Sequence, residues 1–152
     1  MVTKKAKYAL KALLYLARRA GSEPVLIGDL AEAERIPKKF LEAILLDLKN
    51  HGILHSKKGK GGGYGLNKNS DLITVGEVMR IMDGTMAPVS CVSQSAYQRC
   101  EECLDEASCA IRMVMKEVRD ATTKIVDGTT IKDMLDRADA AVRGNKGSMY
   151  YI

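Results

Sequence analysis

The sequence predicts a mainly α-helical fold that carries one small β-hairpin. Apolar residues recur at helical spacing over most of the chain, and two short extended runs flank a single glycine-rich loop. The 152 residues, of which 46% are hydrophobic, suffice for one core and exclude a disordered chain. No stretch approaches the roughly 20 apolar residues that span a bilayer, and the N-terminus lacks the apolar core of a signal peptide. We therefore expect a cytoplasmic protein without a membrane partner.

The first 50 residues should form three helices. An apolar stripe at helical spacing begins near Lys4, and the turn-forming run at 21–24 ends it. Pro37 suits the first turn of a helix because it lacks the N–H group that would be unpaired there, and Gly52 suits the left-handed residue after its end. We expect helices over residues 4–20, 28–33 and 37–50, linked by an extended run at 25–27 and a tight connection at 34–36.

A hairpin should follow these helices. Residues 53–56 and 64–66 predict two short strands, and a basic loop at 57–63 with three consecutive glycines separates them. Helix, short helix, turn, helix and hairpin is the element order of a winged helix-turn-helix, whose last helix before the hairpin enters the major groove of DNA.

The second half should hold one long helix between an irregular segment and a C-terminal helix. Thr74 and Glu77 predict a capping box at the start of a helix over 74–83, and residues 84–109 show no periodic pattern. An apolar stripe over 111–126 predicts a helix of about five turns. After a break at 127–129, we expect a last helix over 131–142 and a loosely ordered tail from Arg143 to Ile152.

Charge is distributed unevenly along the chain, whose net value is +5. Residues 1–68 contain 14 lysines and arginines against 6 acids, whereas residues 69–152 contain 10 against 13. A basic front half is typical of a protein that binds a polyanion, although a solvated basic face without a partner gives the same balance. Together with the helix-turn-helix order, this balance predicts double-stranded DNA as the partner.

The start of the predicted recognition helix supplies the first candidates for DNA contact. Lys38, Lys39 and Glu42 lie there, off the apolar stripe. Lysines contact phosphates or guanine edges, and a glutamate accepts a hydrogen bond from a cytosine amino group. Ordinary exposed charge on a helix is the alternative reading.

The hairpin loop supplies the second group of candidates. Lysines surround glycines that let the backbone turn tightly and approach another surface closely, as a wing on DNA phosphates or in a minor groove would. A nucleotide-binding loop is the rival, but the Walker pattern is absent and no helix follows the glycines directly. The candidates are Lys57, Lys58, Lys60, Gly61, Gly62 and Tyr64.

All four cysteines fall within 19 residues, at the spacing C-x8-C-x2-C-x5-C: Cys91, Cys100, Cys103 and Cys109. In a cytoplasmic protein such a cluster indicates metal or redox chemistry rather than a disulfide framework. An iron–sulfur cluster, a structural zinc ion and metal-free thiols, including a dithiol switch at Cys100 and Cys103, all stay open. A dithiol oxidoreductase would place this pair near parallel strands, which nothing in the sequence predicts, so we expect no enzyme.

The stripe over 111–126 is too apolar to lie exposed to water. It either packs on its own domain or forms the seam of a dimer, and we favour the seam because helix-turn-helix proteins bind two half-sites as dimers. The chain then divides into a DNA-binding region at 1–83, a cysteine-containing sensor loop at 84–110, and a dimerisation helix with a C-terminal helix at 111–152.

Several runs of the sequence resemble the Rrf2 family of winged-helix transcriptional regulators. The resemblance covers roughly residues 3–140, and Cys103, Cys109 and Arg112 are similar to the family's sensor segment. It implies a bacterial repressor that binds palindromic promoter sites as a homodimer with cross-packed long helices. The runs that carry it are residues 7–13, 40–45, 73–78 and the wing at 59–64.

The resemblance also implies an iron–sulfur cluster, 2Fe–2S or 4Fe–4S, held by Cys91, Cys103 and Cys109. Such a cluster would sense redox state, nitric oxide, sulfur species or iron supply. Cys100 is an extra thiol, which either supplies a fourth ligand or resolves oxidation of Cys103.

Besides the extra Cys100, three positions depart from the family pattern, and one of them is Met115, where many members have a tryptophan. Arg112 stands where one type of cluster-binding relative has a histidine, and Lys58 stands where relatives often have an arginine. Because cluster-free members of the family also exist, the alternative is a thiol-switch or ligand-responsive regulator of the same fold, with zinc or no cofactor.

Overall fold

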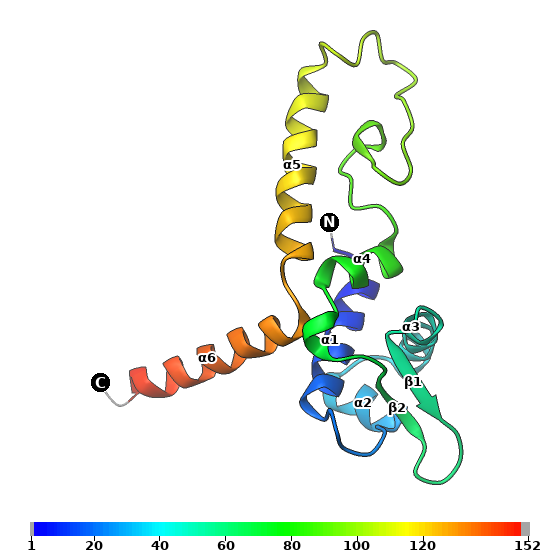
Figure 1. Cartoon of the computed structure of the whole chain (residues 1–152), viewed down its shortest axis with the longest axis vertical. Helices are drawn as coiled ribbons and strands as arrows, with labels where there is room; N and C mark the ends of the chain where they lie inside the picture. The colour runs from blue at the N-terminus through cyan, green and yellow to red at the C-terminus, as the bar shows by residue number, and fades with distance from the viewer. Residues whose placement is uncertain (1, 150–152) are drawn as a thin grey trace.

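The structure, a computed structural model, describes residues 2–149 of the chain, with side chains through residue 146. Figure 1 shows a body of four helices and a hairpin, a long helix that rises from it beside an irregular loop, and a last helix that points away from the body. The predicted mainly helical fold with one hairpin is confirmed. Its elements are α1 (Lys4–Arg18), α2 (Ile27–Glu34), α3 (Lys38–Asn50), β1 (Leu54–Lys57), β2 (Gly63–Leu66), η1 (Ser70–Leu72), α4 (Val75–Asp83), η2 (Ser90–Val92), α5 (Ala110–Asp127) and α6 (Ile131–Met149).

The core lies where the first three helices meet. Leu13 of α1, Leu30 of α2, and Leu41, Leu45 and Leu48 of α3 are fully buried. Within α3 these leucines recur every three or four positions, so the helix buries one face and leaves the other for a ligand. Burial of one such side chain stabilises the fold by about 1.5–3 kcal/mol. This packing holds α2 and α3 in the helix-turn-helix arrangement.

The turn between α2 and α3 contains a left-handed residue that the sequence does not predict. Arg35 adopts the left-handed conformation that usually favours glycine, with φ +54°. The N–H of Ile36 donates to the carbonyl of Ala31 at 2.9 Å, and the Ile36 side chain is buried. Burial of Ile36 therefore offsets the cost of placing Arg35, a residue with a side chain, in the left-handed conformation.

The predicted capping box of α4 forms only by half. The hydroxyl of Thr74 accepts a hydrogen bond from the N–H of Glu77 at 3.1 Å, as expected of an N-cap. The carboxylate of Glu77 does not return to Thr74 but accepts from Lys68 Nζ at 3.0 and 3.1 Å. A charged partner within reach outcompetes the backbone N–H for this carboxylate.

The two longest helices lie at the C-terminal end. α5 has 18 residues, which matches the predicted five turns. The predicted loose tail is wrong from Arg143 to Met149, because α6 continues through these residues, and residues 150–152 lie outside the described part. No proline interrupts the segment, so each further residue extends the helix by one hydrogen bond. No helix within residues 2–149 is long and apolar enough to cross a membrane.

Candidate DNA interface and cysteine pocket

The exposed face of α3 begins with the three charged residues that the sequence singles out. Lys38, Lys39 and Glu42 are exposed, on the opposite side of the helix from its buried leucines. Among the described residues, none forms an ion pair with any of the three. Their charges are therefore available to a ligand.

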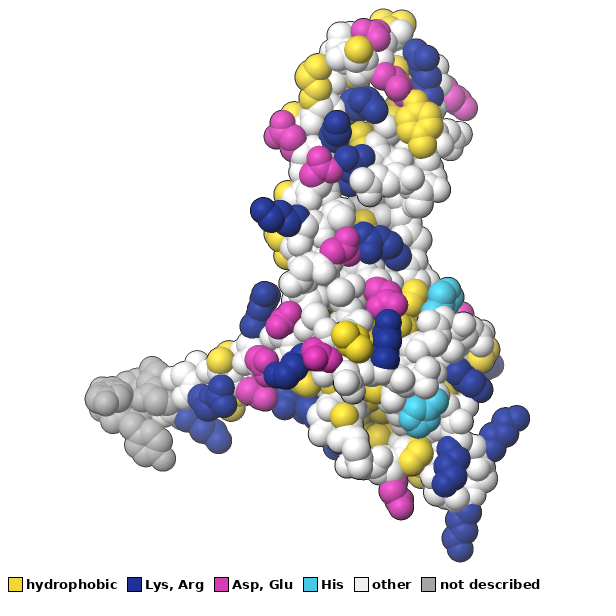
Figure 2. Space-filling model, in the orientation of Figure 1, with side chains coloured by type: hydrophobic (Ala, Val, Ile, Leu, Met, Phe, Trp, Pro, Cys, Tyr) yellow, Lys and Arg dark blue, Asp and Glu magenta, His cyan; other side chains and the backbone are white. Residues whose placement is uncertain are grey.

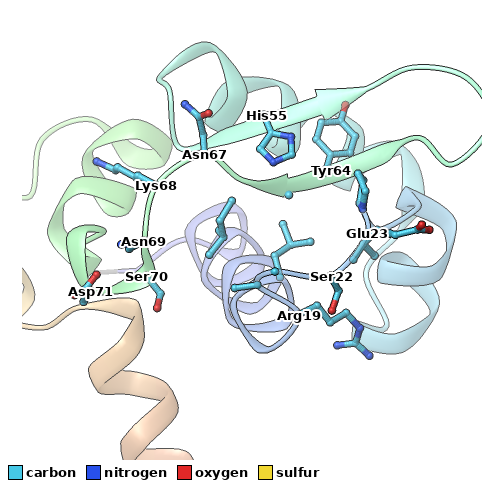
Figure 3. A pocket seen from close by; sticks show the side chains of 17 residues that line it. Arg19, Ser22, Glu23, His55, Tyr64, Asn67, Lys68, Asn69, Ser70 and Asp71 are labelled. Carbon is cyan, nitrogen blue, oxygen red and sulfur yellow. The ribbon is translucent and has the colours of Figure 1, made fainter.

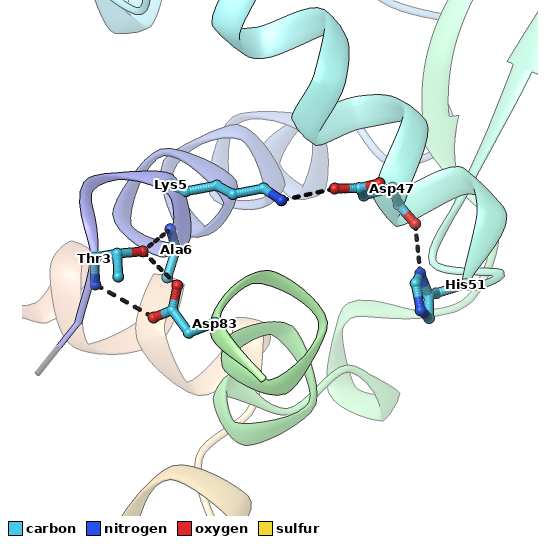
Figure 4. A network of polar contacts seen from close by, with 6 residues as sticks. All are labelled: Thr3, Lys5, Ala6, Asp47, His51 and Asp83. Atoms are coloured by element: carbon cyan, nitrogen blue, oxygen red, sulfur yellow. Dashed lines mark hydrogen bonds and ion pairs between the residues drawn. The ribbon is translucent and has the colours of Figure 1, made fainter. Parts of the chain in front are cut away.

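Polar contacts link α3 to α1 and, separately, the start of α1 to α4 (Figure 4). Lys5 of α1 donates to Asp47 of α3 at 2.8 Å. The ring Nδ1 of His51 lies 2.8 Å from the carbonyl of Asp47 and ties down the C-terminal end of the same helix. Thr3, the N-cap of α1, donates from its N–H to Asp83 of α4 at 3.3 Å and also from its hydroxyl. The recognition helix is thus bonded directly to α1, whose N-terminal end is bonded to α4.

Sequence reasoning missed an aromatic pair beside this helix. The rings of Tyr8 on α1 and Phe40 on α3 meet edge to face, with centroids 5.7 Å apart. Phe40 is the chain's one phenylalanine and follows Lys39 directly. Although its ring is apolar, 45% of its surface is exposed. An apolar residue off the buried stripe of a recognition helix is the signal that could have identified it.

The hairpin projects its lysines away from the body. β1 and β2 pair antiparallel, with Leu54 opposite Leu66 and Lys57 opposite Gly63. Lys57 ends β1, and Lys58 and Lys60 lie in the loop. All three are exposed, and Figure 2 shows basic side chains extending from this end of the molecule. None of the described residues forms an ion pair with these lysines: Lys57, Lys58 and Lys60.

Two glycines of the hairpin are required because backbone atoms occupy the space that a Cβ would take. A Cβ on Gly62 would lie 2.3 Å from the carbonyl oxygen of Lys57, and one on Gly63 would lie 2.3 Å from that of Val25. Gly63 also has φ +142°, a conformation that disfavours any side chain. Gly61, by contrast, has only open space around it, although its φ is +75°.

The root of the hairpin is attached to the body through one pair of hydrogen bonds. The N–H and the C=O of Tyr64 both bond to Val25, at 2.8 Å each. Of the predicted extended run, only Val25 pairs in this way, because Ile27 already belongs to α2. Tyr64 therefore anchors the returning strand, as its position after the glycines suggests.

All four cysteines line one pocket of about 520 Å³ beside the start of α5. Cys91 is buried, whereas Cys100, Cys103 and Cys109 are partly exposed. Leu104 and Ile111 form an apolar part of the wall and are themselves exposed to solvent, by 97% and 68%. The irregular segment 84–109 thus brings together thiols that the sequence separates.

Arg112 ties two of the cysteine-bearing segments together. Its N–H donates to Sγ of Cys109, the N-cap of α5, at 3.4 Å, and its Nε donates to the carbonyl of Cys91 at 3.4 Å. A guanidinium stays protonated and offers no lone pair, so Arg112 orients the pocket but does not supply a ligand there. This gives a physical role to the residue that departs from the family pattern.

The remaining thiols have neighbours of their own. Loss of contact with water and a hydrogen bond with Cys91 raise the pKa of the Cys100 thiol. A hydrogen bond with Cys103 raises the pKa of Arg99, whose guanidinium also donates to the Cys103 carbonyl at 3.3 Å. Within the described residues, no three His, Cys, Asp or Glu side chains are grouped closely enough to hold a single metal ion.

The apolar stripe of α5 is uncovered. No residue of this helix is buried, and Ile111, Val114, Val118 and Ile125 are between 44% and 68% exposed. Packing on its own domain therefore does not account for the stripe. An apolar face of this length normally marks an interface.

Comparison with known proteins establishes the family. A family model named Rrf2, described as an iron-dependent transcriptional regulator, matches residues 2–137. The chain belongs to the Rrf2 family. It is 44% identical to an Rrf2-like helix-turn-helix transcriptional regulator of Rhodobacter capsulatus, over 94% of this chain and 97% of the relative. This Rrf2-family chain is a transcriptional regulator and not an enzyme.

Solved structures support the same assignment. The structure of CymR, the global cysteine regulator of Bacillus subtilis, has a TM-score of 0.75 at 27% identity and covers 90% of this chain and 97% of its own. IscR from T. potens has a TM-score of 0.73 at 25% identity, over 93% of this chain and 90% of its own. The Rrf2 chain therefore has a winged helix-turn-helix fold that binds DNA.

Proposed function

We propose that this regulator binds palindromic promoter DNA as a homodimer, acts as a repressor, and senses redox state, nitric oxide, sulfur species or iron supply at its cysteine pocket. The observation that carries the sensing role is the convergence of four thiols at the start of α5, the helix whose apolar face is uncovered. Residues 1–83 would contact DNA, residues 84–110 would sense, and residues 111–152 would dimerise. A change in the pocket would then move α5 and alter the spacing of the two recognition helices.

The charged end of α3 and the wing supply the DNA contacts in this proposal. Lys38 and Lys39 would contact phosphates or guanine edges, and Glu42 would accept from a cytosine amino group. The wing lysines would lie along phosphates beside the minor groove. Their exposure and the absence of ion pairs with described residues support this assignment.

The donor set of the pocket fits an iron–sulfur cluster better than a single zinc ion. Several bridged irons accept thiolates that stand farther apart than the ligands of one ion, and no described trio of ligands is close enough for one ion. Cys91, Cys103 and Cys109 would hold the cluster, with Cys100 as a candidate fourth ligand. A bound cluster supplies redox and ligand-exchange chemistry at its irons. Arg112 keeps the Cys91 segment on the first turn of α5. Leu104 and Ile111 add an apolar part to a wall that stays open to solvent.

Anaerobic purification tests the cofactor. We expect brown protein with visible absorption, iron and sulfide, and loss of all three in Cys91→Ser, Cys103→Ser and Cys109→Ser. Gel shifts with promoter fragments, with and without oxidant, should show that cluster loss changes DNA affinity. Colourless protein with one zinc per chain would refute the cluster. Metal-free protein whose DNA affinity none of the four serine variants changes would refute the sensing role.

A metal-free thiol switch is the second candidate, and the place of Cys91 and Cys100 in one pocket favours it. In this case the two thiols lose two protons and two electrons to an added disulfide or azo oxidant, and a bond forms between their sulfur atoms. A peptide map of the oxidised, metal-free protein should then show Cys91 joined to Cys100. Both thiols remaining free after diamide treatment would exclude this switch.

A further inference from the structure

The face of α3 that points away from the body is not uniformly charged. The helix turns by about 100° per residue, so positions 39, 43, 46 and 50 lie opposite its buried residues. Two of these four are apolar: Ala43 is exposed, and Leu46 is 51% exposed. The outward stripe therefore runs from Lys39 through two side chains that can neither donate nor accept a hydrogen bond.

The neighbouring sides of α3 are already in contact with the chain. Phe40 meets the ring of Tyr8, and Asp47 accepts from Lys5, so one flank of the helix lies against α1. Leu46 belongs neither to the buried side nor to this flank. Within residues 2–146, the hydrophobic side chains that pack on the core do not include it. Its exposure is therefore not relieved by the fold of the single chain.

The groove at the end of α1, beside the root of the wing, shows the more usual character of a protein surface. Its wall carries Arg19, Glu23 and Asp71, whose charged ends turn outwards (Figure 3). Such groups are well solvated in the free protein and do not call for a ligand. An exposed leucine differs, because a partner that covers its apolar surface removes that surface from water and thereby stabilises the complex.

Leucine and alanine restrict what α3 can contact in a major groove. Adenine, guanine and cytosine present mainly hydrogen-bonding groups there, whereas thymine adds its C5-methyl group. A leucine placed over a purine edge leaves those groups without partners, which weakens binding. Against a thymine methyl group, the same side chain buries apolar surface on both partners. The residue types on this face therefore favour thymine.

We propose that Leu46, with Ala43 beside it, recognises the C5-methyl group of a thymine in each half-site. This inference rests on the proposed DNA face and adds a specificity-determining residue to it. Leu46 follows Lys39 by seven residues, which is about 10 Å along the helix axis and more than the 3.4 Å between base pairs. The thymine therefore lies in a different base pair from the one beside Lys39. Ala43, between them, is too small to hold the helix away from the groove.

Duplexes that carry uracil in place of thymine test this contact, because the exchange removes the C5-methyl group and keeps every hydrogen-bonding group. The preferred duplex is first selected from a random library with the full chain, and each invariant thymine is then exchanged in turn. Fluorescence anisotropy measures the affinity. We expect one exchange to weaken binding about fourfold per half-site, as the loss of one buried methyl group predicts.

Leu46→Ala removes the side chain that would cover the methyl group. The variant should bind the thymine and uracil duplexes with affinities that agree within about twofold, because the coupling between the two groups is lost. Leu72→Ala is the matched control, since Leu72 is 62% exposed on η1, outside the recognition helix, and should keep the native preference. Both leucines are exposed, so neither substitution should change the midpoint of urea denaturation.

An equal uracil penalty in the native chain and in Leu46→Ala would overturn the assignment. A native chain that binds its selected duplex but tolerates uracil at every thymine would overturn it as well. The proposed DNA face would then still stand if Lys39→Gln weakened binding to thymine and uracil duplexes alike. A chain that selects no duplex would overturn both proposals, so failure of the leucine contact and failure of the DNA face are distinguishable.

Discussion

At the scale of single residues, the shape of the wing depends on glycines at positions where a Cβ would meet backbone atoms. The carbonyl oxygen of Lys57 occupies the space beside Gly62, and the hairpin closes only because this space is free. The exposed lysines around it are then presented by a fixed backbone. The shape of the wing and its charge are therefore separate properties that separate substitutions can test.

Gly62→Ala should distort the wing. Its Cβ would contact two backbone carbonyl oxygens, of Lys57 at 2.3 Å and Gly59 at 2.7 Å, and backbone atoms do not move aside as flexible side chains do. We expect a loss of about 1–3 kcal/mol in the free energy of unfolding and a matching fall in DNA affinity. Urea denaturation and gel shifts measure the two effects. Gly28→Ala, which meets nothing within 4 Å inside α2, should be neutral or slightly stabilising.

Lys58→Gln should act on charge alone. Lys58 is exposed on the wing, so its substitution should leave the fold unchanged and remove the one phosphate contact that we propose for it. We expect the slope of log affinity against log salt to decrease by about one, at every DNA sequence alike. Lys124→Gln, on α5 and outside the proposed DNA face, should leave the slope unchanged. A native slope near zero would contradict the wing contacts altogether.

Sequence reasoning predicts an exposed basic wing but not the contacts that require glycine at Gly62 and Gly63. Charge and spacing are readable from the chain, and the exposure of the lysines agrees with them. The carbonyl oxygens that exclude a Cβ at Gly62 and Gly63 become neighbours only when the hairpin closes and Val25 pairs with Tyr64. Contacts of this kind depend on tertiary structure and have no local sequence signal.

At the scale of elements, the sequence predicts where helices lie better than it predicts how they begin and end. Apolar stripes predict the helices whose buried faces form the core and also the long α5, whose stripe stays exposed. The cap of α2 at Arg35, the diversion of Glu77 to Lys68 and the extension of α6 past Arg143 all escape prediction. In the first two cases a partner distant in the chain or a buried neighbour decides the local structure, and no periodic pattern reports it.

A bidentate ion pair links α4 to the end of α5. Arg80 donates to the two carboxylate oxygens of Asp127 at 2.7 and 2.8 Å, and Gly76 leaves the necessary space, since a Cβ there would lie 1.8 Å from Asp127 Oδ1. Hydrogen bonds from Arg80 hold the pKa of Asp127 below its ordinary value. The pair joins the body directly to the helix that carries the cysteine pocket, beside the backbone hydrogen bond from Val75 to Thr129 at 2.9 Å.

Asp127→Asn should therefore have a pH-dependent effect. A carboxyl whose folded pKa is lowered contributes stability above its unfolded pKa of about 3.9 and loses that contribution as pH falls through the folded value. Because both side chains are about 40% exposed, we expect a loss of no more than about 1 kcal/mol at pH 7. Urea denaturation at pH 3 should show a smaller difference between native chain and variant. An equal difference at both pH values would contradict this role of the pair.

At the scale of the whole molecule, α5 connects two functions through its two ends. Its first turn carries Cys109 and Arg112 in the cysteine pocket, and its last residue, Asp127, is bound to α4 of the body. Figure 1 shows that the helix rises away from the body, and midway along it Arg119 donates to the carbonyl of Val92 at 2.6 Å. The sequence predicts this helix and its stripe, but the convergence of the thiols beside it follows from the path of an irregular loop that carries no pattern.

A substitution on the exposed stripe of α5 tests the proposed dimer without disturbing the fold of the single chain. Since no residue of α5 is buried, Val118→Glu should leave the unfolding free energy of the isolated chain unchanged. In a dimer seam the new carboxylate would be buried without a partner, which should weaken dimerisation at least about 100-fold, equivalent to about 3 kcal/mol. Sedimentation equilibrium measures this change, and Lys116→Glu, off the stripe, introduces the same side chain as a control. DNA affinity should fall with the dimer, because two linked half-site contacts become one. A native chain that sediments as a monomer, or a Val118→Glu variant that dimerises like the control, would assign the exposed stripe to some other partner.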